Sequence, residues 1–580
     1  MKKKYLLTAG ILCLALCGCG AKGNEEAQSG SIFEKTEGGE GSEVETSETS
    51  EGENQGNAAE ASTEKPMPSY RVARKYFYNY YDGDMVTDDT EIDYSTYNNG
   101  LLFEGYNEVL LMDDSCKDYY PEMYQTLSDL AAKDKAGSEQ YVTEQTQMAK
   151  EDFENSLKEE YEFYGPYASE DTISIIRSDD KILSYYSYGY DFLGGAHGSY
   201  GIGGETYDVT TGQKIAITDV VKVSEEEFNK VIKDKLLETA QDEDQFWDLD
   251  SSLSHYKYNP KENDPEDYEN YEYDYNWYLG NDGLHVVFNP YEVAAYAYGM
   301  SDITIGYDEF PGMIDEKFAV TDNRGYIVPA SIYITSSRYD EDNESLHLRY
   351  TPELEDPDNG DDYAKELTLI RNGKSATIEE SFLVEYKFTK FYDVKTSDNK
   401  EYIYVTIPEM DDYWALLVYD ITGDDVKAAG TMYYHSFETE DGDGYYVEPL
   451  FSDPDKLQFG DKKDSFGSFT CYGDYKVGAD GIPVFNGDYY KVAWSCSEDV
   501  HSVKEITADV VDEKGNVTEE GAKIPAGESF KILKTDGASW IDAQLGDGRI
   551  VRLKFTSFEY PATIDGVQVD ELFEGLAYAG

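Results

Sequence analysis

The sequence predicts a region of strands and helices followed by a longer region built mostly from strands. Tyr-rich and branched apolar runs alternate with Gly, Asp and Asn turn signals along much of the 580-residue chain. Helical spacing is found between residues 121 and 240, whereas strand patterns dominate beyond residue 316. A chain of this length can bury several separate cores, so we expect two to four domains.

The first residues indicate export and a lipid anchor. A basic start at residues 2–4 precedes an apolar run over 5–16 that is too short to span a bilayer. The run closes with Cys17-Gly18-Cys19, which resembles a bacterial lipobox, and the alternative is an ordinary cleaved signal with incidental cysteines. The resemblance implies lipid attachment at Cys19, which would hold the protein at the outer face of the bacterial cytoplasmic membrane without a spanning helix.

The segment after the lipobox is expected to be a disordered acidic linker. Residues 20–68 consist mainly of Glu, Ser, Thr, Gly and Ala, with twelve Glu against three Lys. Such a segment cannot form a packed core, and its charges repel one another. We therefore expect it to extend and to separate the folded part from the anchor.

Strand and helix patterns then alternate up to residue 315. A β-rich stretch over 70–112 is followed by one long or two short helices over 121–163. Strands are expected at 172–177, 181–191, 204–209, 284–288 and 303–307. Residues 207–215 carry a hairpin signal, with Gly212 at the position that needs a left-handed residue.

One helix start is well marked. Ser224 can cap the helix, Glu227 completes a capping box, and Val223 with Phe228 forms a hydrophobic staple. Phe228 begins an apolar face that we expect to lie against the sheet. The Tyr- and acid-rich stretch over 242–276 has little periodicity and is expected to be a loop.

These motifs resemble a known pair of domains. Gly194-Gly195-Ala196-His197, the 207–215 hairpin, the capped helix and Phe288-Asn289-Pro290-Tyr291 occur in the order found in extracytoplasmic domains of RsiV-type lysozyme-sensing anti-sigma factors. The same pair precedes the catalytic domain of some peptidoglycan deacetylases. The resemblance covers about residues 70–314 and implies an α+β module with helices packed on an antiparallel sheet. No cytoplasmic segment, spanning helix or deacetylase domain with metal-binding histidines accompanies the module, so neither activity is carried over.

The second half is expected to form β-rich domains. Strand-like runs lie at 326–335, 346–350, 366–371, 382–391, 401–407 and 414–420, which suggests one or two sandwiches or barrels. The run 524–533, followed by Trp540-Ile541 and Asp547-Gly548-Arg549, resembles a bacterial SH3-like barrel. We therefore divide the chain into a signal and lipobox at 1–19, the linker at 20–68, the α+β module at 69–315, β-rich sequence at 316–495 and a final β-rich segment, of SH3-like resemblance, at 496–580.

Few residues suggest catalysis or metal binding. The six histidines never fall at i, i+3 or i, i+4, and the mature chain has no CxxC pair, which excludes the common zinc-ligand patterns. Hydrolase and nucleotide-binding motifs are also missing, so we assign no catalytic residue, metal or cofactor. The acidic turns at 356–362 and 440–444 offer oxygen ligands of the kind that Ca²⁺ prefers, but they depart from the EF-hand spacing, and a solvated turn is the favoured interpretation. Cys471 and Cys496 fall in one β region, where either a disulfide or two free thiols would be compatible.

The strongest candidate for ligand binding is a glycine-rich turn with aromatic neighbours. It comprises Tyr188, Gly194, Gly195, His197 and Tyr200. The glycines would let another chain approach and would present the imidazole, although a structural turn in which His197 caps carbonyl groups is the alternative. Exposed Tyr among carboxylates suits a cationic protein, and the same rings could stack on a saccharide.

Charge narrows the choice of partner. With 119 Asp and Glu against 48 Lys and Arg, the net charge is −71, which excludes nucleic acid and anionic lipid as partners held by general electrostatic attraction. We expect a surface-anchored, non-catalytic lipoprotein that binds a wall-associated ligand, with a cationic lysozyme-like protein as the most concrete candidate. The alternatives are a peptidoglycan-acting enzyme or accessory that uses carboxylates as acid and base, and a structural surface protein.

Overall fold

The computed structural model describes most of the chain beyond the linker. The described ranges are 65–81, 85–86, 100–159, 163–242, 244–263, 270–320, 323–338, 346–353, 363–383, 388–410, 412–440 and 443–579. The signal, Cys19, nearly all of the linker and the 356–362 turn lie outside them, as does part of the 440–444 turn. Within these ranges, no helix has the length and apolar character needed to cross a bilayer.

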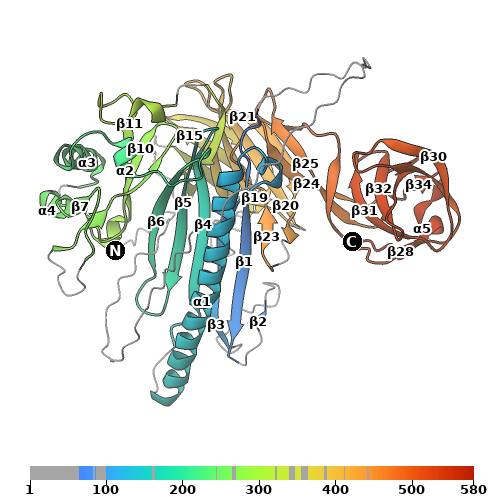
Figure 1. Ribbon diagram of the computed structural model, residues 1–580, viewed down its shortest axis with the longest axis horizontal. Helices are drawn as coiled ribbons and strands as arrows, with labels where there is room; N and C mark the ends of the chain where they lie inside the picture. The colour runs from blue at the N-terminus through green and yellow to red at the C-terminus, as the bar shows by residue number, and fades with distance from the viewer. Residues whose placement is uncertain are drawn as a thin grey trace, which may run out of the picture. The chain divides into compact units, whose positions relative to one another are not determined.

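The first part of the module is a sheet covered by one long helix. The sheet order is β22-β23-β1-β3-β4-β5-β6, with β2 paired to β1. The strands are β1 (Tyr70–Tyr80), β2 (Met85–Val86), β3 (Leu101–Met112), β4 (Tyr167–Ser178), β5 (Ile182–Phe192), β6 (Ser199–Asp208), β22 (Thr439–Glu440) and β23 (Tyr446–Glu448). Helix α1 (Pro121–Glu159) runs along one face (Figure 1), and its Met123 and Leu127 are buried in the same core as strand residues.

The predicted α+β architecture is confirmed, but the sheet contains one parallel pair of strands that was not expected. The helical stretch forms one continuous helix of 39 residues. Because α1 connects β3 to β4 as a crossover, these two strands pair in parallel, while β1–β3, β4–β5 and β5–β6 are antiparallel. The sheet is therefore mixed rather than purely antiparallel.

A second layer holds the capped helix. The strands β9 (Asn276–Leu279), β10 (Gly283–Phe288) and β11 (Ser301–Gly306) form a small antiparallel sheet. Helices α2 (Ile217–Val220), α3 (Glu225–Thr239) and α4 (Leu249–Leu253) share its core, into which α3 directs Phe228 and Leu236. The Ser224 hydroxyl accepts a hydrogen bond from Glu227 N at 3.3 Å, as the capping signal predicted. The predicted loop over 242–276 contains α4 and the short strands β7 (Tyr256–Lys257) and β8 (Tyr273–Asp274).

The hairpin over 207–215 is also confirmed. Asp208 N donates to the Gln213 carbonyl, and Ile215 N donates to the Thr206 carbonyl. Gly212 has φ of +65°, the left-handed conformation for which glycine was expected.

The second half is almost entirely β, as predicted. Its largest sheet contains β12 (Tyr326–Pro329), β18 (Lys390–Lys395), β19 (Glu401–Pro408), β20 (Tyr413–Asp420), β21 (Lys427–His435), β24 (Leu457–Lys463), β25 (Phe469–Val477), β27 (Tyr490–Ser495), β31 (Ser529–Thr535), β32 (Trp540–Leu545), β33 (Ile550–Lys554), β29 (Ile506–Val511) and β30 (Val517–Ile524), in that order. A second sheet contains β13 (Tyr333–Ser336), β14 (His347–Pro352), β15 (Tyr363–Arg371), β16 (Lys374–Ile378) and β17 (Phe382–Leu383). Small elements complete this half: β26 (Pro483–Phe485), β28 (Val500–Ser502), β34 (Thr563–Ile564), β35 (Val567–Gln568), α5 (Val569–Leu572) and β36 (Phe573–Glu574).

The C-terminal segment does not form a closed SH3-like barrel. Strand β28 pairs with β31, and the series continues through β32, β33, β29 and β30. Among the described residues, no pairing joins β30 to β28, so this part of the sheet stays open.

Among the described residues, the thiols of Cys116, Cys471 and Cys496 are free, so the disulfide considered between Cys471 and Cys496 is not formed. Cys496 N donates to the Ser468 carbonyl, which places Cys496 opposite a residue three positions away from Cys471. That offset is about 10 Å along a strand, beyond the span of a disulfide. The buried Cys471 thiol instead points to the Asp461 carbonyl at 3.5 Å, and burial raises its pKa to about 12.

Candidate functional site

A row of aromatic side chains crosses the sheet on the face away from α1. Strand register places Tyr76 opposite Tyr106, Tyr106 opposite Glu170, Glu170 opposite Tyr190 and Tyr190 opposite Tyr200. Directly opposed residues share one face of a sheet, so these five side chains follow one another across β1, β3, β4, β5 and β6. All five are half-buried, which leaves part of each available at the surface.

A paired arginine is built into this aromatic face. Arg74 donates to Glu108 from both Nε and Nη2, and it also donates to the Tyr76 hydroxyl at 2.9 Å. Its guanidinium lies 5.1 Å from the centre of the Tyr106 ring. Glu108 accepts a further hydrogen bond from Ile173 N at 2.6 Å. The charge is therefore neutralised locally, and the row is a rigid aromatic surface rather than a basic one.

The row ends at the turn between β5 and β6, where an aromatic cluster forms. Gly194 and Gly195 supply positive φ angles of +79° and +117°. The exposed His197 ring stacks on Tyr296 with centroids 4.1 Å apart, and Tyr200 meets the same Tyr296 ring edge-on at 5.2 Å. His197 Nδ1 also lies 2.9 Å from the Gly198 carbonyl, so the ring both caps the turn and joins the cluster.

One exposed tyrosine of the cluster has an unusual backbone. Tyr291 has φ of +72°, a conformation that bulky L-residues rarely adopt, and 55% of it is exposed. Its ring lies 5.6 Å from that of Tyr296. Strain of this kind persists only where surrounding structure enforces it, and it is concentrated at binding sites. We call His197, Tyr200, Tyr291 and Tyr296 the tip cluster.

Two asparagines fix the loop that carries Tyr291 and Tyr296. Asn289 Oδ1 accepts from Ile202 N at 2.8 Å, and Asn276 Oδ1 accepts from Gly204 N at 2.9 Å. The Asn276 amide donates back to the Ile202 carbonyl at 2.6 Å. These side chains form hydrogen bonds with backbone N–H and carbonyl groups at the outer edge of β6, as a neighbouring strand would. They thereby hold the loop beside the β5–β6 turn.

The structure brings together only part of the predicted binding set. His197 and Tyr200 meet in the tip cluster, and Gly194 and Gly195 shape its turn. Tyr188 does not join them, because it packs beside Tyr186, Ile202 and Tyr278, and burial together with Glu170 raises its pKa to about 12. Strand β6 begins at Ser199, so Tyr200 lies on a strand rather than in the predicted loop.

Tyr291 and Tyr296 were not assigned as site residues from the sequence. The Phe-Asn-Pro-Tyr motif marked their loop but not its contacts, such as that of Tyr296 with His197, which lies 99 residues earlier in the chain. Only the tertiary structure reveals this juxtaposition.

The α1 face of the sheet contains a pair of acidic side chains, the buried Asp191 and the half-buried Asp171. Asn107 lies within 3.5 Å of Asp171, and Tyr141 donates to Asp191 at 2.8 Å. Burial, reinforced by Asp191, raises the pKa of Asp171 to about 7, and burial also raises the pKa of Asp191. Tyr445, which directly precedes β23, is buried here and donates to Asn107 at 3.1 Å.

A second titratable cluster surrounds His285 on β10. Nδ1 lies 3.0 Å from Asp302 and Nε2 lies 3.0 Å from Asp282, while the ring stacks on Tyr278 at 4.6 Å. Burial lowers the pKa of His285, but the hydrogen bonds to both carboxylates outweigh it and raise the pKa to about 9. The imidazole is therefore charged at neutral pH and joins two acidic side chains. Within the described part of the chain, no cluster of His, Cys, Asp and Glu is arranged to hold a metal ion.

Two family models match adjacent parts of the module. Residues 114–200 match the family described as Deacetylase PdaC, and residues 218–308 match DUF3298, a protein family of unknown function. The first match ends at the β5–β6 turn, and the second contains the loop of Tyr291 and Tyr296. The domain pair expected from the sequence motifs is thus confirmed, and the tip cluster forms where the two matched segments meet. No curated protein matches the chain.

Two crystal structures of DUF3298-family proteins resemble part of the chain. The protein from Bacteroides fragilis is 14% identical, with 43% of this chain and 96% of that chain covered and a TM-score of 0.33. The protein from Pseudomonas aeruginosa is 16% identical, with 44% and 97% covered and a TM-score of 0.26.

Proposed function

We propose that the α+β module is a non-catalytic binding module for a cationic, wall-associated protein, of which a lysozyme-like protein is the most concrete candidate. The tip cluster carries this proposal. It presents three tyrosines and a histidine from the β5–β6 turn, the start of β6 and the loop after β10, and one of the tyrosines is held exposed in a strained conformation. Aromatic side chains of this kind supply large contact areas at little entropic cost.

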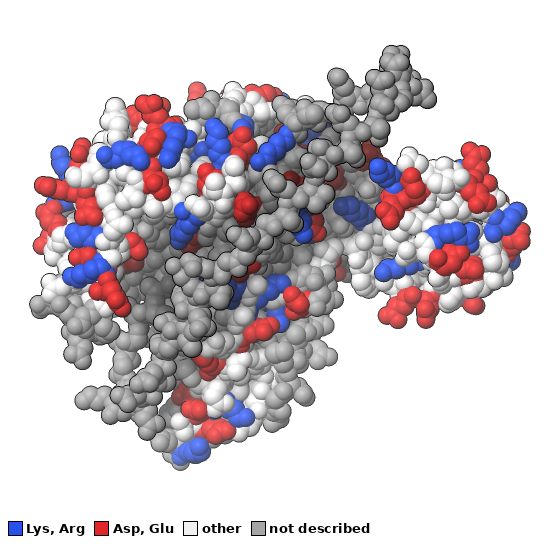
Figure 2. Space-filling model, viewed as in Figure 1, with Lys and Arg blue, Asp and Glu red and all other residues white. Residues whose placement is uncertain are grey.

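Electrostatics would assist the encounter. Acidic side chains are distributed over the visible face, with basic ones among them (Figure 2). The chain as a whole carries a net charge of −71, which would act over long distances. Such a field attracts a cationic protein over long distances and raises its association rate, while short-range contacts at the tip cluster would determine how long the partner stays.

The location that we propose agrees with this role. Lipid attachment at Cys19 and an extended acidic linker would hold the module at the outer face of the cytoplasmic membrane, where a wall-active protein would be met. The matches to the PdaC and DUF3298 families support an extracytoplasmic, wall-related setting.

An enzyme acting on peptidoglycan is the second candidate. It is favoured by the name of the deacetylase family and by the raised pKa of Asp171, since carboxyl groups that titrate near pH 7 suit acid–base catalysis. Asp171 is, however, buried beneath α1 and engaged with Asn107, which suits a structural network better than a substrate site.

A pull-down with residues 65–580 against lysozyme and wall fragments, at low and high salt, tests the proposal. We expect lysozyme to be retained at low salt and released at high salt. Tyr296→Ala should lose retention, and Tyr433→Ala, which alters an exposed tyrosine on β21 away from the tip cluster, should keep it. Equal retention of lysozyme by both variants would contradict the role of the tip cluster, and turnover of wall fragments would support the enzyme.

A further inference from the structure

The turn that carries Tyr291 has an unusual residue at its third position. Glu292 N donates to the Asn289 carbonyl at 3.1 Å, which closes a turn with Pro290 second and the left-handed Tyr291 third. This is the arrangement of a type II turn, whose third position normally requires glycine or asparagine. A tyrosine stays in this conformation only where other contacts hold the turn closed.

Glu292 makes such a contact. Its carboxylate accepts a hydrogen bond from Asn289 N at 2.9 Å, so the last residue of the turn is bonded to the first through both its backbone and its side chain. The hydroxyl of the buried Tyr256 also forms a hydrogen bond with this carboxyl. Tyr256 is itself fixed, because its ring meets Phe288 edge-on at 5.2 Å in the core.

Asn289 joins the same turn to the main sheet. Its Oδ1 accepts from Ile202 N at 2.8 Å, and its Nδ2 donates to the Ile202 carbonyl at 3.2 Å. The backbone N–H of Asn289 is thus held by Glu292, while its side chain is held by β6. The position of the turn beside β6 therefore depends on both residues.

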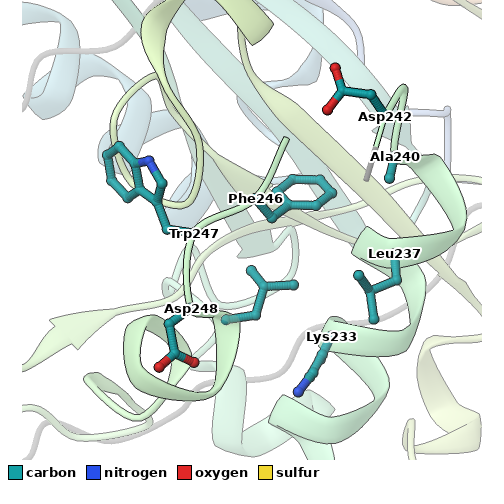
Figure 3. Close-up of a pocket in the computed structure, with 8 residues that line it drawn as sticks. Lys233, Leu237, Ala240, Asp242, Phe246, Trp247 and Asp248 are labelled. Carbon is teal, nitrogen blue, oxygen red and sulfur yellow. The ribbon is translucent and has the colours of Figure 1, made fainter. Parts of the chain in front are cut away.

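The following part of the loop is held by other contacts. Trp247 N donates to the Val293 carbonyl at 3.0 Å, and Phe246 forms a bridge with Ala294. The side chains of Phe246 and Trp247 line a hollow beside α3 (Figure 3). Val293 and Ala294 are buried. The part of the loop that depends on Glu292 is therefore the turn itself.

We propose that Glu292 positions the tip cluster, because it holds the turn closed and thereby keeps Tyr291 in its exposed, left-handed conformation. This inference rests on the proposed function. Glu292 is half-buried and acts here through Tyr291, so it is a positioning residue rather than a contact residue.

The position of the turn should consequently depend on pH. Burial raises the pKa of Glu292 to about 7, although the hydrogen bonds from Asn289 N and from the Tyr256 hydroxyl lower it. Among the described residues, Tyr256 is the titratable side chain that affects this pKa, whereas the neighbouring His255 directs Nδ1 to the Tyr271 carbonyl at 2.8 Å. Because the folded-state pKa is raised, the stabilisation of the turn is complete below about pH 4.5 and is lost as the pH rises through 7.

Hydrogen exchange of segment 289–296 and the dissociation rate of lysozyme, both measured on residues 65–580 at pH 5, test the proposal. Glu292→Ala should lower the protection of the segment about tenfold and speed dissociation by a similar factor. Glu292→Gln retains an acceptor oxygen and should restore both values to those of the unaltered protein. Tyr256→Phe, a second variant that keeps the ring in the core, should cause a smaller loss of about threefold.

Glu309→Ala is the matched control. Glu309 accepts from Gly306 N at 3.1 Å, which is the same contact between a carboxylate and the N–H three residues earlier, but it lies in the turn after β11. This variant should leave the protection of the segment and the dissociation of lysozyme unchanged.

A pH profile separates positioning from general stability. From pH 5 to pH 8, the protection of the segment, corrected for the intrinsic exchange rate, should fall at least about tenfold more in the unaltered protein than in Glu292→Gln. The two proteins share every other titratable group, Asp171 included, so the difference reports on Glu292 alone.

Equal protection and equal dissociation in Glu292→Ala and Glu309→Ala would overturn the inference, as would a loss of protection in Glu292→Ala without faster dissociation of lysozyme. If the exchange results are as expected but the unaltered protein does not bind lysozyme, Glu292 still fixes the turn and the proposed function fails.

Discussion

Asp542 in the C-terminal half and Asp171 in the N-terminal module differ in whether a basic side chain pairs with them. In the C-terminal half, Asp542 is fully buried and receives two hydrogen bonds from Arg552, at 2.6 and 2.8 Å, with Lys534 at 3.7 Å. In the N-terminal module, Asp171 lies beside a second acid, Asp191. Within the described residues, neither of these two acids has a basic side chain at ion-pair distance.

This difference indicates where the molecule is built for stability and where it tolerates strain. The Asp542 cluster is closed, because Arg552 also stacks on Trp540 at 3.8 Å and every charge has a partner. In the module, by contrast, Asp171 and Asp191 lack a basic partner among the described residues, and the exposed Tyr291 has a strained backbone. Backbone strain is a feature expected of a functional region, whereas Asp171 and Asp191 belong to the structural network beneath α1.

The largest effect should come from opening the closed cluster. Asp542→Ala leaves the Arg552 charge without its partner in a poorly solvated position and should destabilise the C-terminal half by about 3–5 kcal/mol. Denaturant unfolding followed by tryptophan fluorescence measures this. Asp547→Asn, which alters the exposed pair with Arg549, is the control and should leave the transition unchanged. Equal effects of the two substitutions would show that the Asp542 cluster is not a closed, buried one.

Removing an acid from the module should stabilise the protein, whereas removing Asp542 should destabilise it. The folded-state pKa of Asp171 is raised to about 7, so its contribution to stability is present below about pH 4 and is lost as the pH rises through 7. Asp171→Asn should therefore stabilise the protein by about 2 kcal/mol at pH 8 and change little at pH 4. Thermal unfolding at both pH values measures the effect, and destabilisation at pH 8 would contradict the assignment.

His285 shows that the module can also pair its charges. Its folded-state pKa is raised to about 9, so its stabilising contribution is complete below about pH 6.5 and is lost as the pH rises through 9. His285→Gln should cost about 1–2 kcal/mol at pH 6. The difference from the unaltered protein should shrink above pH 9 in the same unfolding experiment, and a difference independent of pH would argue against a charged imidazole.

The smallest stability effect should come from the strained tyrosine. Tyr291→Gly removes the cost of a left-handed backbone and should stabilise the protein by about 0.5–1 kcal/mol, while weakening lysozyme binding. Tyr291→Phe keeps both the ring and the strain and is the matched comparison. If Tyr291→Gly bound lysozyme as well as the unaltered protein, the strain would have no connection with binding.

Local signals predicted the elements well, whereas contacts between distant segments could not be predicted. The Ser224 cap and the Gly212 turn were predicted because their causes lie within a few residues. The tip cluster could not be predicted because it depends on the contact of Tyr296 with the distant His197. Whether Cys471 and Cys496 can form a disulfide depends on the register of β25 and β27, which the sequence does not reveal. Tyr188 was misplaced for a similar reason, since it shares a strand with Tyr190 but packs against the second sheet.

The same reason explains why the origin of β23 was not foreseen. Tyr446–Glu448 lies in the predicted β-rich half, yet it pairs with β1 of the module, and Tyr445 is buried beside α1. A short strand contributed from more than 300 residues away leaves no periodic signal in either segment.

The association rate constant of residues 65–580 with lysozyme, measured against ionic strength for the unaltered protein and Tyr296→Ala, tests the roles of the acidic field and the tip cluster together. We expect the association rate to fall at least about tenfold from low to physiological salt in both proteins. We also expect Tyr296→Ala mainly to speed dissociation. No complex at low salt, or an association rate independent of salt with dissociation unchanged by Tyr296→Ala, would contradict the proposed function.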